Sequence, residues 1–227
     1  SAIRGMIGGG AEKKDKPLTQ EPQVEKAISN STQRGEKVKI QRGSESVELG
    51  EKEKGEGSES FDYNVPGIVP IIAQPSNLTC WATVATMMVS WKDSVSYPIT
   101  DVMDSAGAIY RTKFDNNQGL LGSEKPAFLA ALGLTGEAPQ SYSVQGFRNL
   151  LESVGPLWAT TDELPGDGFA IHARIVTGMF GDGTPENTFL RINDPAGGRQ
   201  YSETFLKFMQ KFEEVAAGGL RVQIVHF

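Results

Sequence analysis

The chain has 227 residues, of which 38% are hydrophobic, and a formal net charge of −6. No apolar run approaches the roughly 20 residues that a membrane helix needs, so we expect no membrane span. The acidic balance argues against nucleic acid as a partner, because such binding needs clustered Lys and Arg. One cysteine cannot form an internal disulfide, and with two histidines it is too small a set for a structural zinc site. We therefore expect no metal and no cofactor.

The composition divides the chain in two. All 19 aromatic residues lie at or after Phe61, and residues 1–60 carry 11 Lys/Arg against 11 Asp/Glu. Such a segment cannot bury enough apolar surface to offset its loss of conformational entropy. We interpret 1–60 as a disordered or extended charged linker or tail, with a pro-segment or chaperone-docking arm that orders on a partner as the alternative. Residues 61–227 are expected to form one globular domain.

Helical patterns come first in this domain. Apolar residues recur at helical spacing over 80–91, and Thr100 is placed to cap a helix over 101–112. Ser123 and the residues after it open another helix that Gly133 ends, and a further helix runs from its cap Ser143 to Gly155.

Strand patterns follow the helices. We expect strands over 157–161, 169–180, 188–193 and 219–227 and an amphipathic helix over 202–215. The turn Gly181-Asp182-Gly183-Thr184 predicts a hairpin between the second and third strands. Helices followed by strands indicate an α+β fold rather than alternating βαβ units.

Cys80 stands at the predicted start of a helix, after a turn formed by Asn77-Leu78-Thr79. A helix N-terminus concentrates backbone N–H groups and positive potential, which favours a thiolate over a thiol. A buried, unreactive cysteine is the alternative at such a position.

His172 lies in a strand pattern and Asp194 ends the next strand, directly before a proline. Neutral imidazole is well suited to take a thiol proton, and a carboxylate can hold the ring in one tautomer. The hairpin should bring both residues to the same edge of the sheet. Asn193 is the alternative third member, because strand alternation lets only one of two neighbours face His172. The alternatives without a catalytic role are a hydrogen-bonded core histidine for His172 and an ordinary turn for the segment with Asp194.

Gln74 precedes Cys80 by six residues, and its side-chain amide could donate to an oxyanion together with the Cys80 backbone N–H. Trp81 and Trp158 are candidates for walls of a substrate cleft, although a role in the core fits each of them as well.

Together these residues resemble the papain-like cysteine peptidases. The resemblance covers about residues 64–227 and is carried by Gln74, by Cys80-Trp81-Ala82, by His172 and by Asn193-Asp194-Pro195. It is most similar to compact bacterial branches, namely bacteriocin-processing peptidases and the papain-like effectors and toxins that bacteria deliver into other cells. The gap of 92 residues between Cys80 and His172 is shorter than the ~130–150 of lysosomal relatives, which indicates a trimmed core.

The resemblance implies a helical lobe, with the nucleophile helix packed on an antiparallel sheet. It implies Cys80 as nucleophile, His172 as general base and then acid, Asp194 as orienting residue and Gln74 as oxyanion donor. It further implies cleavage of a protein substrate in the cytoplasm of a target cell, by a secreted or delivered effector whose N-terminal segment joins a delivery module. A cognate immunity protein fits the same picture.

Three other functions fit the same residues. The first is a peptidoglycan amidase or peptidase, or a protein deamidase, with the same triad. The second is a non-catalytic binding module on this scaffold. The third is a leader-peptide peptidase that works beside a transporter.

Overall fold

The structure is a computed structural model, and it describes residues 59–163 and 171–227 together with the backbone of residues 6–7. The predicted linker therefore lies almost wholly outside the described residues. None of the helices described is both long and apolar enough to span a bilayer. The helices are α2 (Cys80–Asp93), α3 (Ile99–Ala106), α4 (Ala108–Asp115), α5 (Lys125–Ala131), α6 (Val144–Val154) and α7 (Phe205–Ala217).

The helix that begins at Cys80 is confirmed, and it is the most deeply buried one. Side chains on all its faces from Cys80 to Met88 are inaccessible to solvent. A helix that is apolar all round needs packing on every side. Helix α2 accordingly contacts both the other helices and the sheet, next to β5 (Leu157–Asp162) and β6 (Ile171–Gly181).

The helix predicted over 101–112 is wrong as a single element. It is two helices, α3 and α4, separated by Gly107 at a φ of +137°. Only glycine adopts such a backbone readily, so the chain breaks there and turns. The first of the two is preceded by Pro98 in an extended conformation rather than capped by Thr100.

Two other helix predictions are confirmed. Ser143 caps α6 by accepting a hydrogen bond from the Gly146 N–H at 3.0 Å, and Gly155 ends that helix at a φ of +92°. Helix α5 also forms where expected and is followed closely by Gly133, at a φ of +71°.

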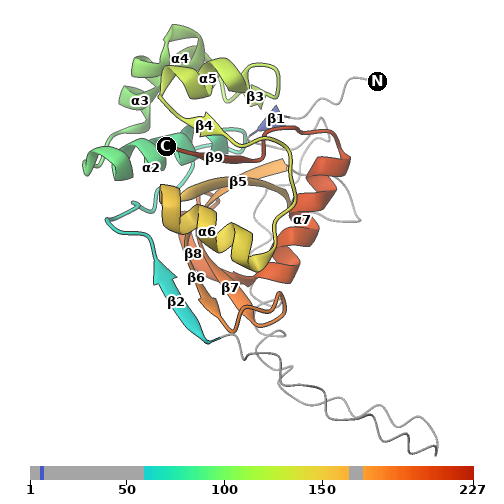
Figure 1. Ribbon diagram of the computed structural model, residues 1–227. Helices are drawn as coiled ribbons and strands as arrows, with labels where there is room; N and C mark the ends of the chain where they lie inside the picture. Colours follow the sequence, from blue (N-terminus) through green and yellow to red (C-terminus); the bar gives the residue numbers. More distant parts are fainter. Residues whose placement is uncertain (1–5, 8–58, 164–170) are drawn as a thin grey trace, which may run out of the picture.

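The sheet is antiparallel and has the strand order β4-β9-β5-β6-β7-β8, with β2 paired to β6 outside this path. Figure 1 shows α2 to α5 gathered on one side of the molecule and the sheet with α6 and α7 on the other. The remaining strands are β1 (Met6–Ile7), β2 (Phe61–Asn64), β3 (Leu120–Leu121), β4 (Thr135–Gly136), β7 (Thr188–Asp194), β8 (Arg199–Thr204) and β9 (Ile224–His226).

The hairpin between β6 and β7 is confirmed, but three details differ from the sequence prediction. Strand β8 and the short β2 and β4 were not expected, and the predicted strand over 219–227 shrinks to β9. Helix α7 begins at Phe205, because Thr204 caps it through its hydroxyl and the residues before it belong to β8. The first residues of the predicted strand 169–180 lie outside the described residues.

The helices and the sheet share one hydrophobic core. Apolar side chains of α2 pack on those of β5 and β6, and α7 covers β5 and the neighbouring strands. The α+β class is thus confirmed. This packing holds the first turn of α2 against the strand that carries His172, and so it positions the candidate site.

Candidate active site

Cys80 is the first residue of α2 and is fully buried. The turn before it is held by Thr79, whose hydroxyl donates to the Ser76 carbonyl at 2.9 Å. Because this hydroxyl points back into the turn, no side chain caps the start of α2. Thr79 is thus the N-cap by position but not by hydrogen bonding. The backbone N–H groups of the first turn, that of Cys80 among them, have no partner within their own helix.

His172 is the second residue of β6, opposite Thr161 of β5, and only 1% of its surface is exposed. Strand β6 is buried along most of its length, so its neighbours hold the ring on every side. Such a position fixes the imidazole in one orientation.

Asp194 ends β7 and lies on the same face of the sheet as His172. Its Oδ1 lies 2.7 Å from Nε2 of His172 and also accepts the backbone N–H of Ala196 at 2.8 Å. Asn193 points to the opposite face, where its Nδ2 donates to the Val69 carbonyl at 3.1 Å. Strand alternation therefore brings Asp194 and not Asn193 to the histidine.

The contact with Asp194 leaves Nδ1 of His172 as the nitrogen that can serve Cys80. Nδ1 is buried and has no hydrogen bond of ordinary geometry, while the thiol lies close enough to interact with the ring. Burial works against the charged ring, but Asp194 and Cys80 together raise the pKa of His172 to about 10. Burial also works against the Asp194 carboxylate, yet His172, Arg174 and Tyr201 hold its pKa below its usual range.

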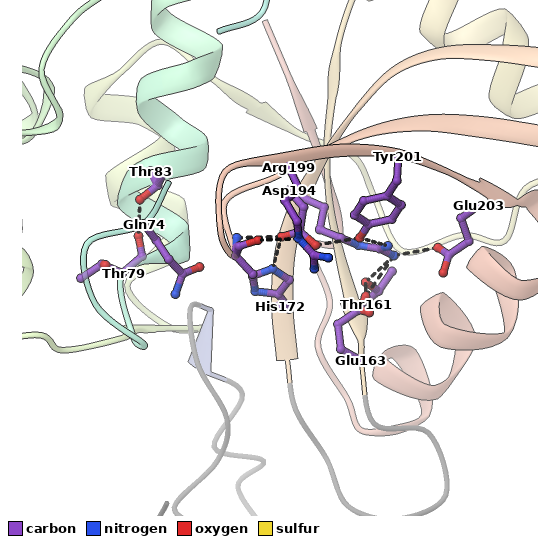
Figure 2. Close-up of polar contacts among 12 residues, drawn as sticks. Gln74, Thr79, Thr83, Thr161, Glu163, His172, Asp194, Arg199, Tyr201 and Glu203 are labelled. Atoms are coloured by element: carbon purple, nitrogen blue, oxygen red, sulfur yellow. Dashed lines mark hydrogen bonds and ion pairs between the residues drawn. The ribbon is translucent and has the colours of Figure 1, made fainter. Parts of the chain in front are cut away.

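Gln74 lies on the extended segment before the turn. Its backbone N–H donates to the Pro195 carbonyl at 2.8 Å, which ties this segment to the end of β7. Its side-chain Nε2 donates to the Ser76 carbonyl at 2.8 Å. Figure 2 shows Gln74 beside the start of α2, between that helix and His172.

Polar residues behind Asp194 were missed from the sequence. Tyr201 of β8 donates to Oδ2 of Asp194 at 2.7 Å, and Arg174 of β6 donates to the Tyr201 hydroxyl at 3.1 Å. Strand β8 escaped notice because its sequence, Arg199-Gln200-Tyr201-Ser202-Glu203-Thr204, has no apolar alternation. The charge of Arg174 inside an otherwise apolar strand was the available signal, since a buried charge needs partners.

The remaining candidates lie apart from this site or in the core. Trp81 and Trp158 are both fully buried, and Trp81 donates from Nε1 to the Gln118 carbonyl at 3.0 Å. Their contact with substrate stays a prediction. The other histidine, His226, lies 2.5 Å from Oε1 of Glu137 at another part of the sheet. Within the described part of the chain, no three His, Cys, Asp or Glu side chains gather as ligands for a metal ion.

Comparison with known families points the same way as the fold. A family described as papain-like cysteine protease AvrRpt2 matches residues 60–213, which is more than half of the chain. The chain belongs to this family of papain-like cysteine proteases. A search of curated proteins gives no match. Membership confirms the papain-like fold and the enzyme class, a hydrolase of peptide bonds. In this papain-like protease the matched region includes Gln74, Cys80, His172 and Asp194.

Proposed function

We propose that this protein hydrolyses a peptide bond in a protein substrate, with Cys80 as nucleophile, His172 as proton carrier and Asp194 as the residue that orients the ring. One observation carries the proposal. Nε2 of His172 is held by Asp194 at 2.7 Å, so Nδ1 is left for the sulfur at the start of α2. A nucleophile, a base and a group that orients the base are the three parts of covalent acyl transfer.

The charge state supports a thiolate mechanism. Because the pKa of His172 is raised to about 10, the ring is protonated near neutral pH. An imidazolium beside a sulfur at a helix N-terminus favours the thiolate.

The reaction proceeds through a thioester. The Cys80 thiolate attacks the substrate carbonyl carbon, and the negative charge passes to the carbonyl oxygen. The tetrahedral intermediate expels the amine, which takes the proton from Nδ1 of His172. The now neutral ring removes a proton from water, and the resulting hydroxide attacks the thioester. Collapse releases the carboxylic acid, and the sulfur leaves as a thiolate beside the protonated ring.

Two donors are available for the oxyanion. The backbone N–H of Cys80 lies in the helix turn that no side chain caps. The Gln74 amide has two protons, and its bond to the Ser76 carbonyl uses one of them. Donors fixed before the reaction stabilise the developing charge without reorganisation. Cys80 and His172 are both buried.

We further propose that the protein is a delivered effector or toxin that acts in the cytoplasm of a target cell. A catalytic thiol without a disulfide partner suits a reducing compartment, and the single cysteine fits this requirement. Residues 1–60 would link the protease to a delivery module, and a cognate immunity protein would protect the producing cell. The resemblance to compact bacterial effectors supports this assignment.

The test compares proteomes of cells that express the native chain or its variants, and counts new protein termini. His172→Gln has a matched control in His226→Gln, because each histidine bonds a carboxylate but only His172 lies beside Cys80. We expect new termini with the native chain and with His226→Gln, and none with Cys80→Ala or His172→Gln. Cleavage that persists in folded Cys80→Ala would rule the proposal out.

A further inference from the structure

One face of the sheet carries a row of polar side chains behind His172. His172 and Arg174 lie two residues apart on β6 and therefore share a face of the sheet. The same holds for Tyr201 and Glu203 on β8, and Asp194 ends β7 between these two strands. The register pairs Asp194 with Arg199, so Tyr201 stands two residues further along the same face. Diagonal neighbours of this kind lie within reach of an aromatic side chain.

The hydrogen bonds along this row have a fixed direction. The guanidinium of Arg174 can only donate, so its Nη1 donates to the Tyr201 oxygen at 3.1 Å. The single proton of the Tyr201 hydroxyl is therefore committed to Oδ2 of Asp194, at 2.7 Å. Figure 2 shows Asp194 beside His172, with Tyr201 and then Glu203 following in the same row.

Arg174 is itself immobilised, and none of its surface is exposed. Its Nη2 lies 3.0 Å from a carboxylate oxygen of Glu163 and 3.0 Å from one of Glu203, and it donates to the Thr161 hydroxyl at 3.1 Å. Lys211 of α7 pairs with the same two carboxylates. Buried charges are stable only when they are paired in this way, so the guanidinium cannot swing away from Tyr201.

We propose that Tyr201, held by Arg174, is a positioning residue for the reaction: it fixes the second carboxylate oxygen of Asp194 so that the first stays aligned with His172. This inference rests on the proposed function of His172 and Asp194. Without the hydroxyl, the carboxylate keeps, among the described residues, only the hydrogen bonds at Oδ1, with His172 and with the Ala196 N–H. It could then rotate about its own bond and weaken its contact with the ring.

The charge on His172 reports this alignment. If Tyr201 aligns the carboxylate, its loss weakens support for the imidazolium and the pKa of His172 falls. If the hydroxyl merely disperses the carboxylate charge, its loss concentrates that charge and the pKa rises. Within the described part of the chain, the ionisable groups that interact with the ring are Cys80 of α2, Glu163 after β5 and Asp194 of β7. Arg174 of β6 and Tyr201 of β8 act on Asp194. Glu203 of β8 pairs with Arg174, Lys211 of α7 pairs with Glu163, and Arg199 of β8 lies by the Tyr201 ring.

The experiment is a pH titration of the full chain labelled with ¹⁵N-histidine, followed by NMR. Two histidines give two imidazoles, and His226→Gln assigns them. Tyr201→Phe keeps the ring and removes the hydroxyl. Tyr97→Phe is the matched control, because Tyr97 donates to Asp93 at 2.8 Å at an exposed site. We expect Tyr201→Phe to move the pKa of His172 from about 10 towards 6.5 and Tyr97→Phe to leave it unchanged. An unchanged or raised value in Tyr201→Phe would overturn the inference.

Kinetics give a second readout. A hydrogen bond to a charged group suggests a loss of about ten- to a hundredfold in kcat for Tyr201→Phe, with KM unchanged because the hydroxyl does not face substrate. Arg174→Lys keeps the charge but loses the planar guanidinium that holds Tyr201. Adding Arg174→Lys to Tyr201→Phe should therefore lower kcat little further. Full additivity of the two would contradict a shared role. The titration needs no substrate, so it remains decisive about Tyr201 even if the native chain cleaves nothing.

Discussion

Nε2 of His172 lies 2.7 Å from Oδ1 of Asp194, a residue 22 positions further along the chain. The hairpin between β6 and β7 creates this contact, because it lays the two strands side by side and antiparallel, and so returns the end of β7 to the start of β6. The contact uses the nitrogen remote from Cys80, and so the imidazole can bind a carboxylate on one side and serve the sulfur on the other.

Asp194→Asn should lower kcat at least about a hundredfold, because the amide supports the imidazolium less well and lets the ring adopt the wrong tautomer. The raised pKa of His172 depends on the Asp194 charge. The alkaline limb of the activity profile should therefore move from near pH 10 towards 6.5. Measurement of kcat/KM against pH on a cleaved peptide checks both effects.

Asn193→Ala is the neighbouring control. It removes the hydrogen bonds to the Val69 carbonyl and from Gln200, so we expect a loss of about 1–3 kcal/mol in the free energy of unfolding. The pH profile of activity should keep its shape. A profile displaced as in Asp194→Asn would argue that Asn193 orients the ring instead.

Gln74→Ala should slow turnover by about a hundredfold or more, as expected for the loss of one oxyanion donor. The backbone bond from Gln74 to the Pro195 carbonyl remains in this variant, so the segment should keep its place. Gln200→Ala is a control for the loss of a nearby glutamine. Single-turnover measurements with saturating substrate isolate the chemical step, and a normal rate in Gln74→Ala would remove this residue from the mechanism.

The contact between His172 and Asp194 could be predicted from the sequence, whereas the residues of β8 that support Asp194 could not. Helix α2, the hairpin and the ends of β6 and β7 follow from local periodicity and turn residues, and these suffice to bring His172 and Asp194 together. The support from β8 could not be predicted in the same way. Its inward residues, including Tyr201 and Glu203, are polar, because they bond to Asp194 and Arg174 rather than to an apolar core. Polar pairing of this kind leaves no hydrophobic period in β8.

Lys125→Met should change how stability depends on pH. Lys125 is buried, and its Nζ donates to the Val222 carbonyl at 2.8 Å and lies 4.9 Å from the centre of the Trp158 ring. Burial lowers the pKa of Lys125 to about 7, and the influence of Cys80 opposes this shift only in part. The unfolded chain then binds a proton that the folded one lacks between pH 7 and 10.5, so the stability contributed by this group rises with pH there.

His172 acts in the opposite sense. Its pKa is raised from 6.5 to about 10, so the stability it contributes is complete below pH 6.5 and is lost as pH rises to 10. Each group contributes a slope of about 1.4 kcal/mol per pH unit, and the two slopes nearly cancel between pH 7 and 9. In urea unfolding, the free energy of unfolding of Lys125→Met should decline as the pH rises, whereas that of the native chain should not. Lys92→Met, at an exposed lysine, is the control, and a flat profile in Lys125→Met would refute the argument.

Gly155→Ala should destabilise the fold without changing the chemistry. Gly155 has a φ of +92°, and a Cβ there would lie 2.5 Å from Cη2 of Trp91. That ring cannot easily move, because its Nε1 donates to the Pro66 carbonyl at 2.7 Å. Gly133→Ala is a matched control, since Gly133 also follows a helix with φ at +71° but a Cβ there meets nothing within 4 Å.

Both substitutions place alanine at a positive φ, which costs roughly 1–3 kcal/mol. Gly155→Ala adds overpacking against Trp91, which typically costs about 1–3 kcal/mol more. Chemical denaturation should rank the native chain above Gly133→Ala and Gly133→Ala above Gly155→Ala. The rate per folded molecule should remain native in both, because neither glycine contacts the site. Equal losses of stability in the two variants would mean that the Trp91 ring moves aside, and that backbone conformation alone determines the loss in free energy of unfolding.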